Sequence, residues 1–262
     1  MRSSKSWKGE ILLSESIKRI CTLTGRSVKE IIRDPISIVF LIGLPLAMEI
    51  LFYLIFHSMT DQFEMKYLAP GIVVFSQAFI SLFSGLLISL DRAGSFLVRL
   101  FVSKAKPYEF IFGYALALFP IAIVQSILFF VVGGIIDSSL WSVGMIYGIL
   151  ISMVTAIFFG GAGILLGSVC NEKSVGGVAS VIIAGQSMLS GMWFPTQGMS
   201  KSFLTFMRVL PFKNATMLVQ NALNGVNDVF DDFLFPLIIV LAYTATIFIA
   251  AIVCFGKKMK NL

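Results

Sequence analysis

Few residues of this chain have the type and spacing that enzyme catalysis or metal binding requires. His57 is the only histidine among the 262 residues, and it lies at the outer boundary of an apolar run. Such a histidine is typical of a membrane interface rather than of a catalytic base. Cys21, Cys170 and Cys254 show no CxxC or Cys/His spacing, and no GxxxxGK[ST] or GxSxG motif occurs. We therefore expect no catalytic residue, no metal and no cofactor bound by this polypeptide.

Glu49 is the one charged residue inside a predicted membrane span. It lies about 13 residues into the first apolar run, roughly 20 Å from its start in a helix. A charge at that depth costs at least about 2.5 kcal/mol, so it needs a polar partner, water or a cavity. Two interpretations remain open. Glu49 contributes to a substrate path, or it snorkels outward or bonds a neighbouring helix.

A basic loop, DRAGSFLVRLFVSKAKP, separates the second and third apolar runs at residues 91–107. Its apolar residues recur at i, i+1, i+4 and i+5, which predicts a short helix with one apolar face. The apolar positions are Phe96, Leu97, Leu100 and Phe101, and the basic ones are Arg92, Arg99, Lys104 and Lys106. Such a helix fits a groove on a soluble partner. A helix that merely rests on lipid headgroups has the same pattern.

The composition requires a membrane to position these residues. Hydrophobic residues make up 57% of the chain, charged residues 13%, and the mean hydropathy is +0.93. About 20 apolar residues cross a bilayer as a helix. We expect an all-α polytopic membrane protein with six transmembrane helices. The predicted spans are Ile36–Phe56, Tyr67–Leu90, Phe110–Ile136, Trp141–Val169, Val175–Phe194 and Phe233–Phe255.

Basic residues are distributed unevenly between the two sides. Sixteen of the 20 Lys and Arg residues lie in residues 1–35, 91–109, 170–174 or after Phe255. The remaining four are Lys66, Lys201, Arg208 and Lys213. By the positive-inside rule both termini are cytosolic. The pI of about 9.3 reflects this asymmetry, and no nucleic-acid partner is expected.

The chain divides into two parts. Residues 1–35 form a cytosolic N-terminal segment whose stretch Ser14–Arg33 has amphipathic helical spacing, and Asp34-Pro35 ends it. We expect this helix at the membrane surface, with lipid as a partner, although a solvated helix is the alternative. Residues 36–262 form the transmembrane domain, with the basic loop at 91–109 and an external re-entrant helical hairpin at 195–232. In that hairpin, Pro211 separates two short helices and Asn214 is the candidate N-cap of the second.

Small residues recur on the fourth span at Ala156, Gly160, Gly163 and Gly167. This spacing lets helices approach closely. Packing inside one subunit is the favoured interpretation, and a seam between two subunits is the alternative.

Three segments in order resemble the permease subunit of ABC-2 type ABC transporters. YLAPGIVVFS, residues 67–76, resembles the Pro-Gly opening of the second span in that family. DRAGSFLVRLFVSKAKPYEFIFGYAL, residues 91–116, is similar to its loop with a Gly-Ser pair and a closing proline. MLSGMWFPTQGMSKSFLTFMRVLPFKNAT, residues 188–216, is similar to the exit of span five and the external hairpin that follows. The resemblance covers nearly the whole chain.

The resemblance implies partners that the sequence itself does not supply. They are two copies of a separate cytosolic ATP-binding subunit, which would hold the ATP and Mg²⁺, and a second permease subunit, identical or homologous. The basic loop would be the coupling helix to this ATPase. The residues implied in coupling are Arg92, Ser95, Phe96, Arg99, Leu100, Phe101, Lys104 and Lys106.

The resemblance also implies an exporter in the bacterial cytoplasmic membrane. Spans one, two and five would line a cavity for an amphipathic or hydrophobic cargo such as a drug, peptide, lipid or glycan-lipid. The candidate lining residues are Glu49, Phe52, Phe75, Gln77, Phe83, Gln186, Ser190 and Trp193. Two alternatives are a non-transporting resistance or scaffold protein and an ion-coupled secondary transporter.

Overall fold

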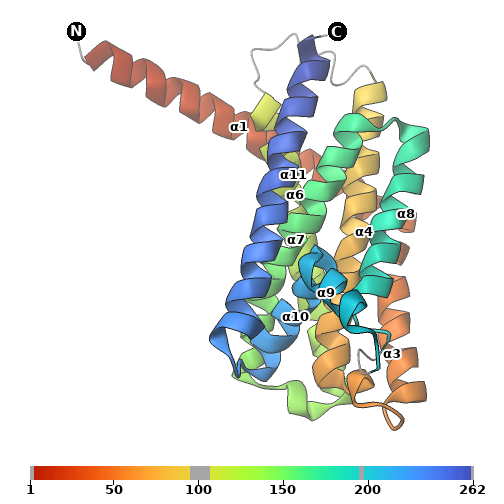
Figure 1. Cartoon of the computed structure of the whole chain (residues 1–262). Helices are drawn as coiled ribbons and strands as arrows, with labels where there is room; N and C mark the ends of the chain where they lie inside the picture. The colour runs from red at the N-terminus through yellow and green to blue at the C-terminus, as the bar shows by residue number, and fades with distance from the viewer. Residues whose placement is uncertain (1–2, 95–106, 195–197, 261–262) are drawn as a thin grey trace.

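The computed structural model describes residues 3–94, 107–194 and 198–260, and these residues form helices without any strand (Figure 1). The long helices are α1 (Ser3–Arg33), α3 (Leu44–Phe56), α4 (Met65–Ala93), α6 (Pro107–Ile136), α7 (Val143–Val169), α8 (Glu172–Leu189) and α11 (Phe235–Lys260). The long helices other than α1 stand side by side, whereas α1 runs outward from the bundle across their direction (Figure 1). The prediction of an all-α polytopic membrane fold is confirmed.

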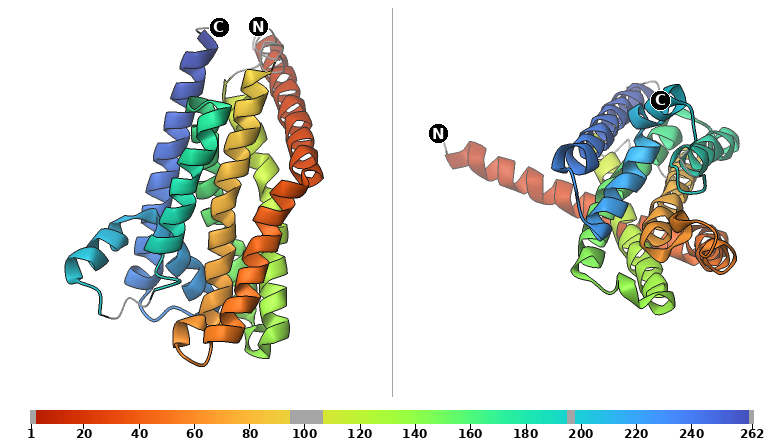
Figure 2. Two further views of the ribbon diagram at one scale, coloured as in Figure 1. Left: turned by 90° about the vertical axis from the view of Figure 1, so that its right-hand side faces the viewer. Right: turned by 60° about the horizontal axis from the view of Figure 1, so that its bottom comes forward.

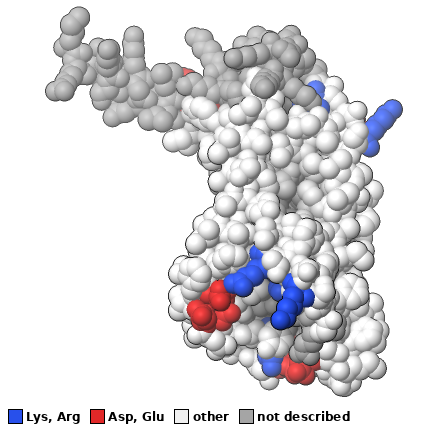
Figure 3. Space-filling model, in the orientation of Figure 1, with Lys and Arg blue, Asp and Glu red and all other residues white. Residues whose placement is uncertain are grey.

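Within the described residues, five helical stretches are long and apolar enough to cross a membrane. They are Pro35–Phe56, Met65–Ala93, Tyr108–Ile136, Val143–Val169 and Val229–Gly256. Helix α8 is 18 residues long and less apolar, yet it packs along α4 in the same bundle (Figure 1). On the face drawn in Figure 3, a broad band without charged side chains covers the middle of the bundle. The number of six spans therefore stays a prediction, with α8 as the candidate for the fifth.

The predicted fifth span ends earlier than the sequence indicated. We expected it to continue to Phe194, but α8 ends at Leu189. Gly191 follows with φ of 76°, which a residue with a side chain rarely adopts. The chain therefore turns at this glycine, and Trp193 lies in the turn rather than on a helix.

Helix α4 is the centre of the bundle. In its most apolar stretch, 89% of the residues are buried, against 17% in the first span. Helix α7 approaches it closely because small residues face each other: a Cβ at Gly167 would lie 2.7 Å from the carbonyl oxygen of Gly85. Gly163 lies against Ser81 and Ser84 in the same way. This part of the stripe on the fourth span therefore packs within one subunit, as favoured.

Two prolines within the apolar helices leave backbone carbonyls without their usual partner. Proline has no N–H, so the carbonyl four residues earlier needs another donor where water is absent. Gln125 of α6 donates its amide to Leu41 O at 2.7 Å, the carbonyl that Pro45 leaves free. Asn224 donates to Lys66 O at 2.8 Å, four residues before Pro70. Amides from other helices thus hold span one and the start of α4 in place.

The segment that we predict to be external forms a hairpin of two short helices, as expected from its sequence. Helix α9 (Lys201–Val209) begins after Ser200, whose hydroxyl accepts from Phe203 N, and α10 (Pro211–Asn224) follows the proline. The prediction that Asn214 caps the second helix was wrong. Pro211 occupies the first position of α10, where proline is favoured, and the Asn214 amide donates instead to the Arg208 and Leu210 carbonyls. Figure 2 shows the hairpin beside the lower parts of the long helices rather than beyond them.

The predicted orientation can be tested by cysteine labelling after the native cysteines are replaced. An impermeant thiol reagent applied outside should modify a cysteine at Ser202 in α9 and should not modify one at Lys258 in α11. The physical reason is the excess of basic residues on the side that holds both termini. The intact-cell signal is compared with that after permeabilisation. Modification of the Lys258 position in intact cells would contradict the topology.

Candidate functional site

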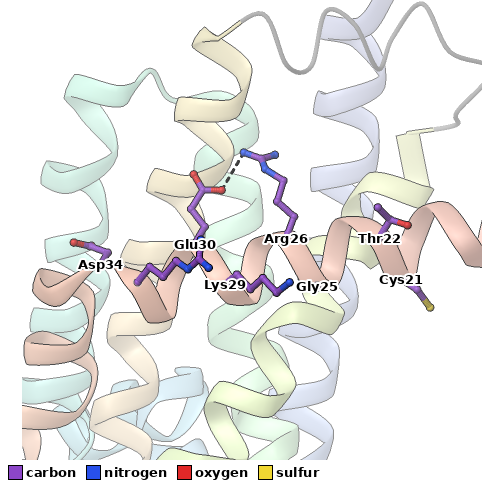
Figure 4. A pocket seen from close by; sticks show the side chains of 8 residues that line it. Cys21, Thr22, Gly25, Arg26, Lys29, Glu30 and Asp34 are labelled. Carbon is purple, nitrogen blue, oxygen red and sulfur yellow. Dashed lines mark ion pairs between the residues drawn. The ribbon is translucent and has the colours of Figure 1, made fainter.

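Helix α1 is attached to the end of α4 by a buried carboxylate. Asp91 is 5% exposed, and it accepts hydrogen bonds from both terminal nitrogens of Arg26 and from the Tyr114 hydroxyl at 2.7 Å. Arg26 also forms an ion pair with Glu30 at 3.0 Å, one turn along α1 (Figure 4). Burial lowers the pKa of Arg26, but the hydrogen bond and the charge of Asp91 raise it more. The Arg26 guanidinium therefore stays charged.

A second buried carboxylate attaches α1 to the start of α6. Glu109 is 3% exposed, and its oxygens accept from Arg19 Nε at 3.0 Å and from the Ser16 hydroxyl at 2.5 Å. The hydrogen bond to Glu109 raises the pKa of Arg19. Leu23 of α1 fills the space at Gly113, where a Cβ would lie 2.7 Å from the leucine Cδ2. We call the pairs Arg26–Asp91 and Arg19–Glu109 the α1 clamp.

The α1 clamp encloses the two ends of the predicted coupling loop. Asp91 lies near the end of α4, and Glu109 lies in the first turn of α6. Seven of the eight residues implied in coupling lie outside the described part of the chain: Ser95, Phe96, Arg99, Leu100, Phe101, Lys104 and Lys106. Their role stays a prediction. The described residues nevertheless bring both ends of this loop onto one face of α1.

Arg92, the eighth residue implied in coupling, contacts the end of α7. Its guanidinium donates to the carbonyls of Gly167 at 2.9 Å, of Ser168, and of Cys170 at 2.8 Å. These carbonyls have no partner within the helix, and a cation there is favoured by the helix dipole. Arg92 therefore fixes the turn between α7 and α8. Any contact of Arg92 with a partner protein would compete with these bonds.

A hollow of about 700 Å³ runs along α1 beside the clamp (Figure 4). Side chains at Arg26, Lys29, Glu30 and Arg33 line it, together with Asp34 at the end of the helix. Lys29 and Arg33 are exposed, whereas Arg26 is engaged by Asp91. The wall thus carries charged groups of both signs. No group of three or more His, Cys, Asp or Glu residues suited to a metal occurs among the described residues.

Four of the predicted cargo-path residues lie together in one aromatic cluster. Trp193 contacts Phe52 with ring centroids 4.4 Å apart and Phe75 with centroids 5.8 Å apart. The ring centroid of Phe83 lies 6.5 Å from that of Phe40. The Phe40 centroid lies 6.0 Å from that of Phe79, and Phe79 contacts Phe75, so Phe83 is connected to the same cluster. We call this series from Phe83 to Phe52 the aromatic ladder. It joins span one, α4 and the turn after α8.

Glu49 lies on α3, three residues before Phe52 of the aromatic ladder. It is fully buried between α3, α4 and α6, and a Cβ at Gly133 would lie 3.2 Å from its Oε1 and 3.2 Å from Ala69 Cβ. Neither carboxyl oxygen has a hydrogen-bond partner among the described residues. The structure therefore places Glu49 against neighbouring helices.

The other predicted polar residues of the cargo path bond within the subunit. Gln77 is fully buried and faces α7, where it donates to Ser152 O at 2.9 Å and accepts from Thr155 at 2.5 Å. Gln186 donates to Thr216 of α10 at 2.9 Å, and Ser190 accepts from Met192 N at 3.2 Å. Gln77 and Gln186 thus fix contacts between helices, whereas Ser190 bonds within the turn that carries Trp193 of the aromatic ladder.

Sequence reasoning missed Arg19, Arg26 and Glu109 as residues of this region. The two arginines are seven residues apart, which places them on nearly the same face of a helix about two turns apart. That spacing was visible in the sequence, but it did not indicate which carboxylates the arginines would meet.

The sequence matches the family model of the ABC-2 type transporter over residues 18–224. The matched region begins in α1 before Arg19 and ends with the last residue of α10, so it contains the α1 clamp and the aromatic ladder. A comparison with curated proteins finds no match. The match covers well over half of the chain, and the helices are those of a multi-pass membrane protein. The chain therefore belongs to the ABC-2 type transporter family and is a permease subunit of an ABC-type transporter.

Proposed function

We propose that this chain is the transmembrane subunit of an ATP-driven exporter of the bacterial cytoplasmic membrane. Two permease subunits, identical or homologous, would assemble with two copies of a separate ATP-binding subunit that carries ATP and Mg²⁺. The observation that carries the proposal is the family match over residues 18–224, which includes the basic loop and the helices that flank it. Permeases of this family normally work with an ATP-binding subunit.

The basic loop is the part of the chain that would contact the ATPase. Its predicted apolar face at Phe96, Leu100 and Phe101 would dock in a groove of the ATP-binding subunit. Two observations on the described residues support this role: both flanking carboxylates are held by α1, and Arg92 fixes the neighbouring turn. A loop anchored at both ends can transmit a displacement to the helices that anchor it.

The aromatic ladder is the part of the chain that would contact the cargo. Its rings belong to spans one and two and to the turn after α8, the elements from which the cavity was expected. Aromatic and apolar side chains with few polar groups suit an amphipathic or hydrophobic molecule. A drug, peptide, lipid or glycan-lipid fits this description.

The proposal can be tested by purification and an ATPase assay. Purified alone, the chain should hydrolyse no ATP above background, because its sequence contains no phosphate-binding loop. Co-expressed with an ATP-binding subunit, it should co-purify with that subunit. Hydrolysis by the complex in liposomes should then rise with a transported amphipathic cargo. Robust hydrolysis by a preparation shown by mass spectrometry to lack any ATPase would contradict the proposal.

A further inference from the structure

The α1 clamp joins the loop to span one through continuous structure. Helix α1 ends at Arg33, and Asp34 caps the next helical segment, α2 (Pro35–Ile38). The Asp34 carboxylate accepts from Ile36 N at 3.3 Å and from Ser37 N at 3.1 Å. After α2, the π-helical turn η1 (Val39–Gly43) leads directly into α3. The bend between α1 and span one is therefore a hydrogen-bonded joint, visible as the corner in Figure 2.

The two carboxylates of the clamp depend on their arginines. Asp91 and Glu109 are almost fully buried, and a buried carboxylate that loses its cation is strongly destabilised. Arg19 and Arg26 lie on nearly the same face of α1, about 10 Å apart along its axis. A displacement of either loop end therefore has to move α1 or break a buried ion pair.

Span one follows α1 directly and has few buried residues, so a displacement of α1 can move it. Only 17% of its most apolar stretch is buried within the subunit, against 89% for α4. It carries Phe40 and Phe52, two members of the aromatic ladder, and Phe40 packs on Phe79 of α4. A shift of α1 would therefore separate the two sides of the ladder.

We propose that Arg19 and Arg26 are positioning residues that transmit movement of the coupling loop through α1 into span one, and so open the aromatic ladder. This inference rests on the proposed function, because ATP acts on the loop through the partner subunit. Neither arginine contacts ATP or cargo in this scheme. Each acts through the carboxylate that it holds at one end of the loop.

The test measures the opening of the ladder directly. A cysteine replaces Phe79 in a chain whose native cysteines have been removed. Phe79 is 7% exposed and packs against Phe40, so a thiol at this position is protected while span one stays in place. The complex with the ATP-binding subunit is purified, and the rate of thiol modification by a small methanethiosulfonate reagent is measured with and without ATP. ATP should raise this rate when Arg26 and Arg19 are intact.

The Arg26→Asp variant should lose the ATP-dependent rise in modification. It should still insert, retain the ATP-binding subunit and hydrolyse ATP, because the coupling loop itself is unchanged. Exchanging the charges, with Arg26→Asp and Asp91→Arg in one chain, should restore the rise. The same pair of measurements applies to Arg19→Glu and to its exchange with Glu109→Arg. Lys29→Asp is the matched control, because it makes the same charge change at an exposed residue of α1.

Three outcomes would overturn the inference. The first is an ATP-dependent rise in the thiol modification rate that is undiminished in both single variants, Arg26→Asp and Arg19→Glu. The second is a loss in Arg26→Asp that charge exchange does not restore in a folded complex. The third is loss of the ATP-binding subunit itself, which would mean that the arginines contact that partner.

Three further cases also have a defined outcome. If Arg26→Asp does not accumulate in the membrane, the neutral Arg19→Gln and Arg26→Gln variants are measured in its place, with the same expectation. If the unaltered complex shows no ATP-dependent change at all, this inference fails while the ATPase and transport assays still decide the proposed function. If no ATP-binding subunit co-purifies, the proposed function and this inference both fail.

Discussion

Replacing Leu100 and Phe101 together by aspartate should abolish transport and release the ATP-binding subunit, while the protein still inserts normally. The two residues lie on the apolar face that the spacing of the basic loop predicts. Burial of each such side chain in a partner is worth roughly 1.5–3 kcal/mol, and a buried unpaired carboxylate adds a further penalty. The expected loss of affinity is therefore at least about a hundredfold. Pull-down of the ATP-binding subunit, normalised to the membrane level of the chain, measures it.

The control places a negative charge on the opposite side of the predicted helix. At a helical period of 3.6 residues, Val102 falls about 160° from Leu100 and about 100° from Phe101. Its replacement by aspartate should leave partner binding and transport close to normal. A helix that merely rests on headgroups predicts little loss in either variant, since it adds little to the anchoring of the long spans. Full partner binding and transport by the Leu100→Asp, Phe101→Asp chain would show that this face is not the coupling contact.

Replacing Gly163 by alanine should prevent α4 and α7 from packing. A Cβ at this position would overlap the Ser84 hydroxyl and the Ser81 carbonyl, and it would lie 2.8 Å from Ser81 Cα. Because two of these atoms belong to backbone at the centre of the bundle, no side-chain rotation relieves the overlap. Overpacking of this kind costs typically about 1–3 kcal/mol, and more where backbone must move. We expect a lower melting temperature in detergent and less folded protein in the membrane.

Gly177 on α8 is the matched control for this substitution. It is a helical glycine in the same domain, but a Cβ there has nothing within 4 Å. Alanine is favoured over glycine in a helix by about 1 kcal/mol. Gly177→Ala should therefore leave the melting temperature of the chain unchanged or raise it. Equal melting temperatures for the two variants would contradict the close packing described for α4 and α7.

The positions of the apolar helices could be predicted because each depends on local sequence. The long runs of apolar residues indicated the helices that the structure contains, and Asp34-Pro35 indicated the break before span one. The end of the fifth span could not be found in this way. Met192, Trp193 and Phe194 continue the apolar run, and only the backbone conformation of Gly191 turns the chain there.

The aromatic part of the candidate cargo path could be predicted in part. Residue type and position in the spans predict a role for Phe52, Phe75, Phe83 and Trp193, and the structure connects these rings, in part through Phe40 and Phe79. The polar part of the path could not be predicted from the sequence. A buried amide side chain can hydrogen-bond equally well to a cargo and to a neighbouring helix. Gln77 and Gln186 bond to other helices of the same chain.

By itself, the sequence determined that this protein lies in a membrane, where its helices are, and which family it resembles. The length of an apolar run and the basic charges beside it determine how a segment interacts with the bilayer. Both are properties of local sequence, so they can be recognised without knowledge of the tertiary structure. Only the tertiary structure decided that Arg26 meets Asp91 and that Arg19 meets Glu109, across 65 and 90 residues of chain. Those pairs form because helix packing brings α1 beside the ends of α4 and α6, and buried carboxylates need the nearest cation.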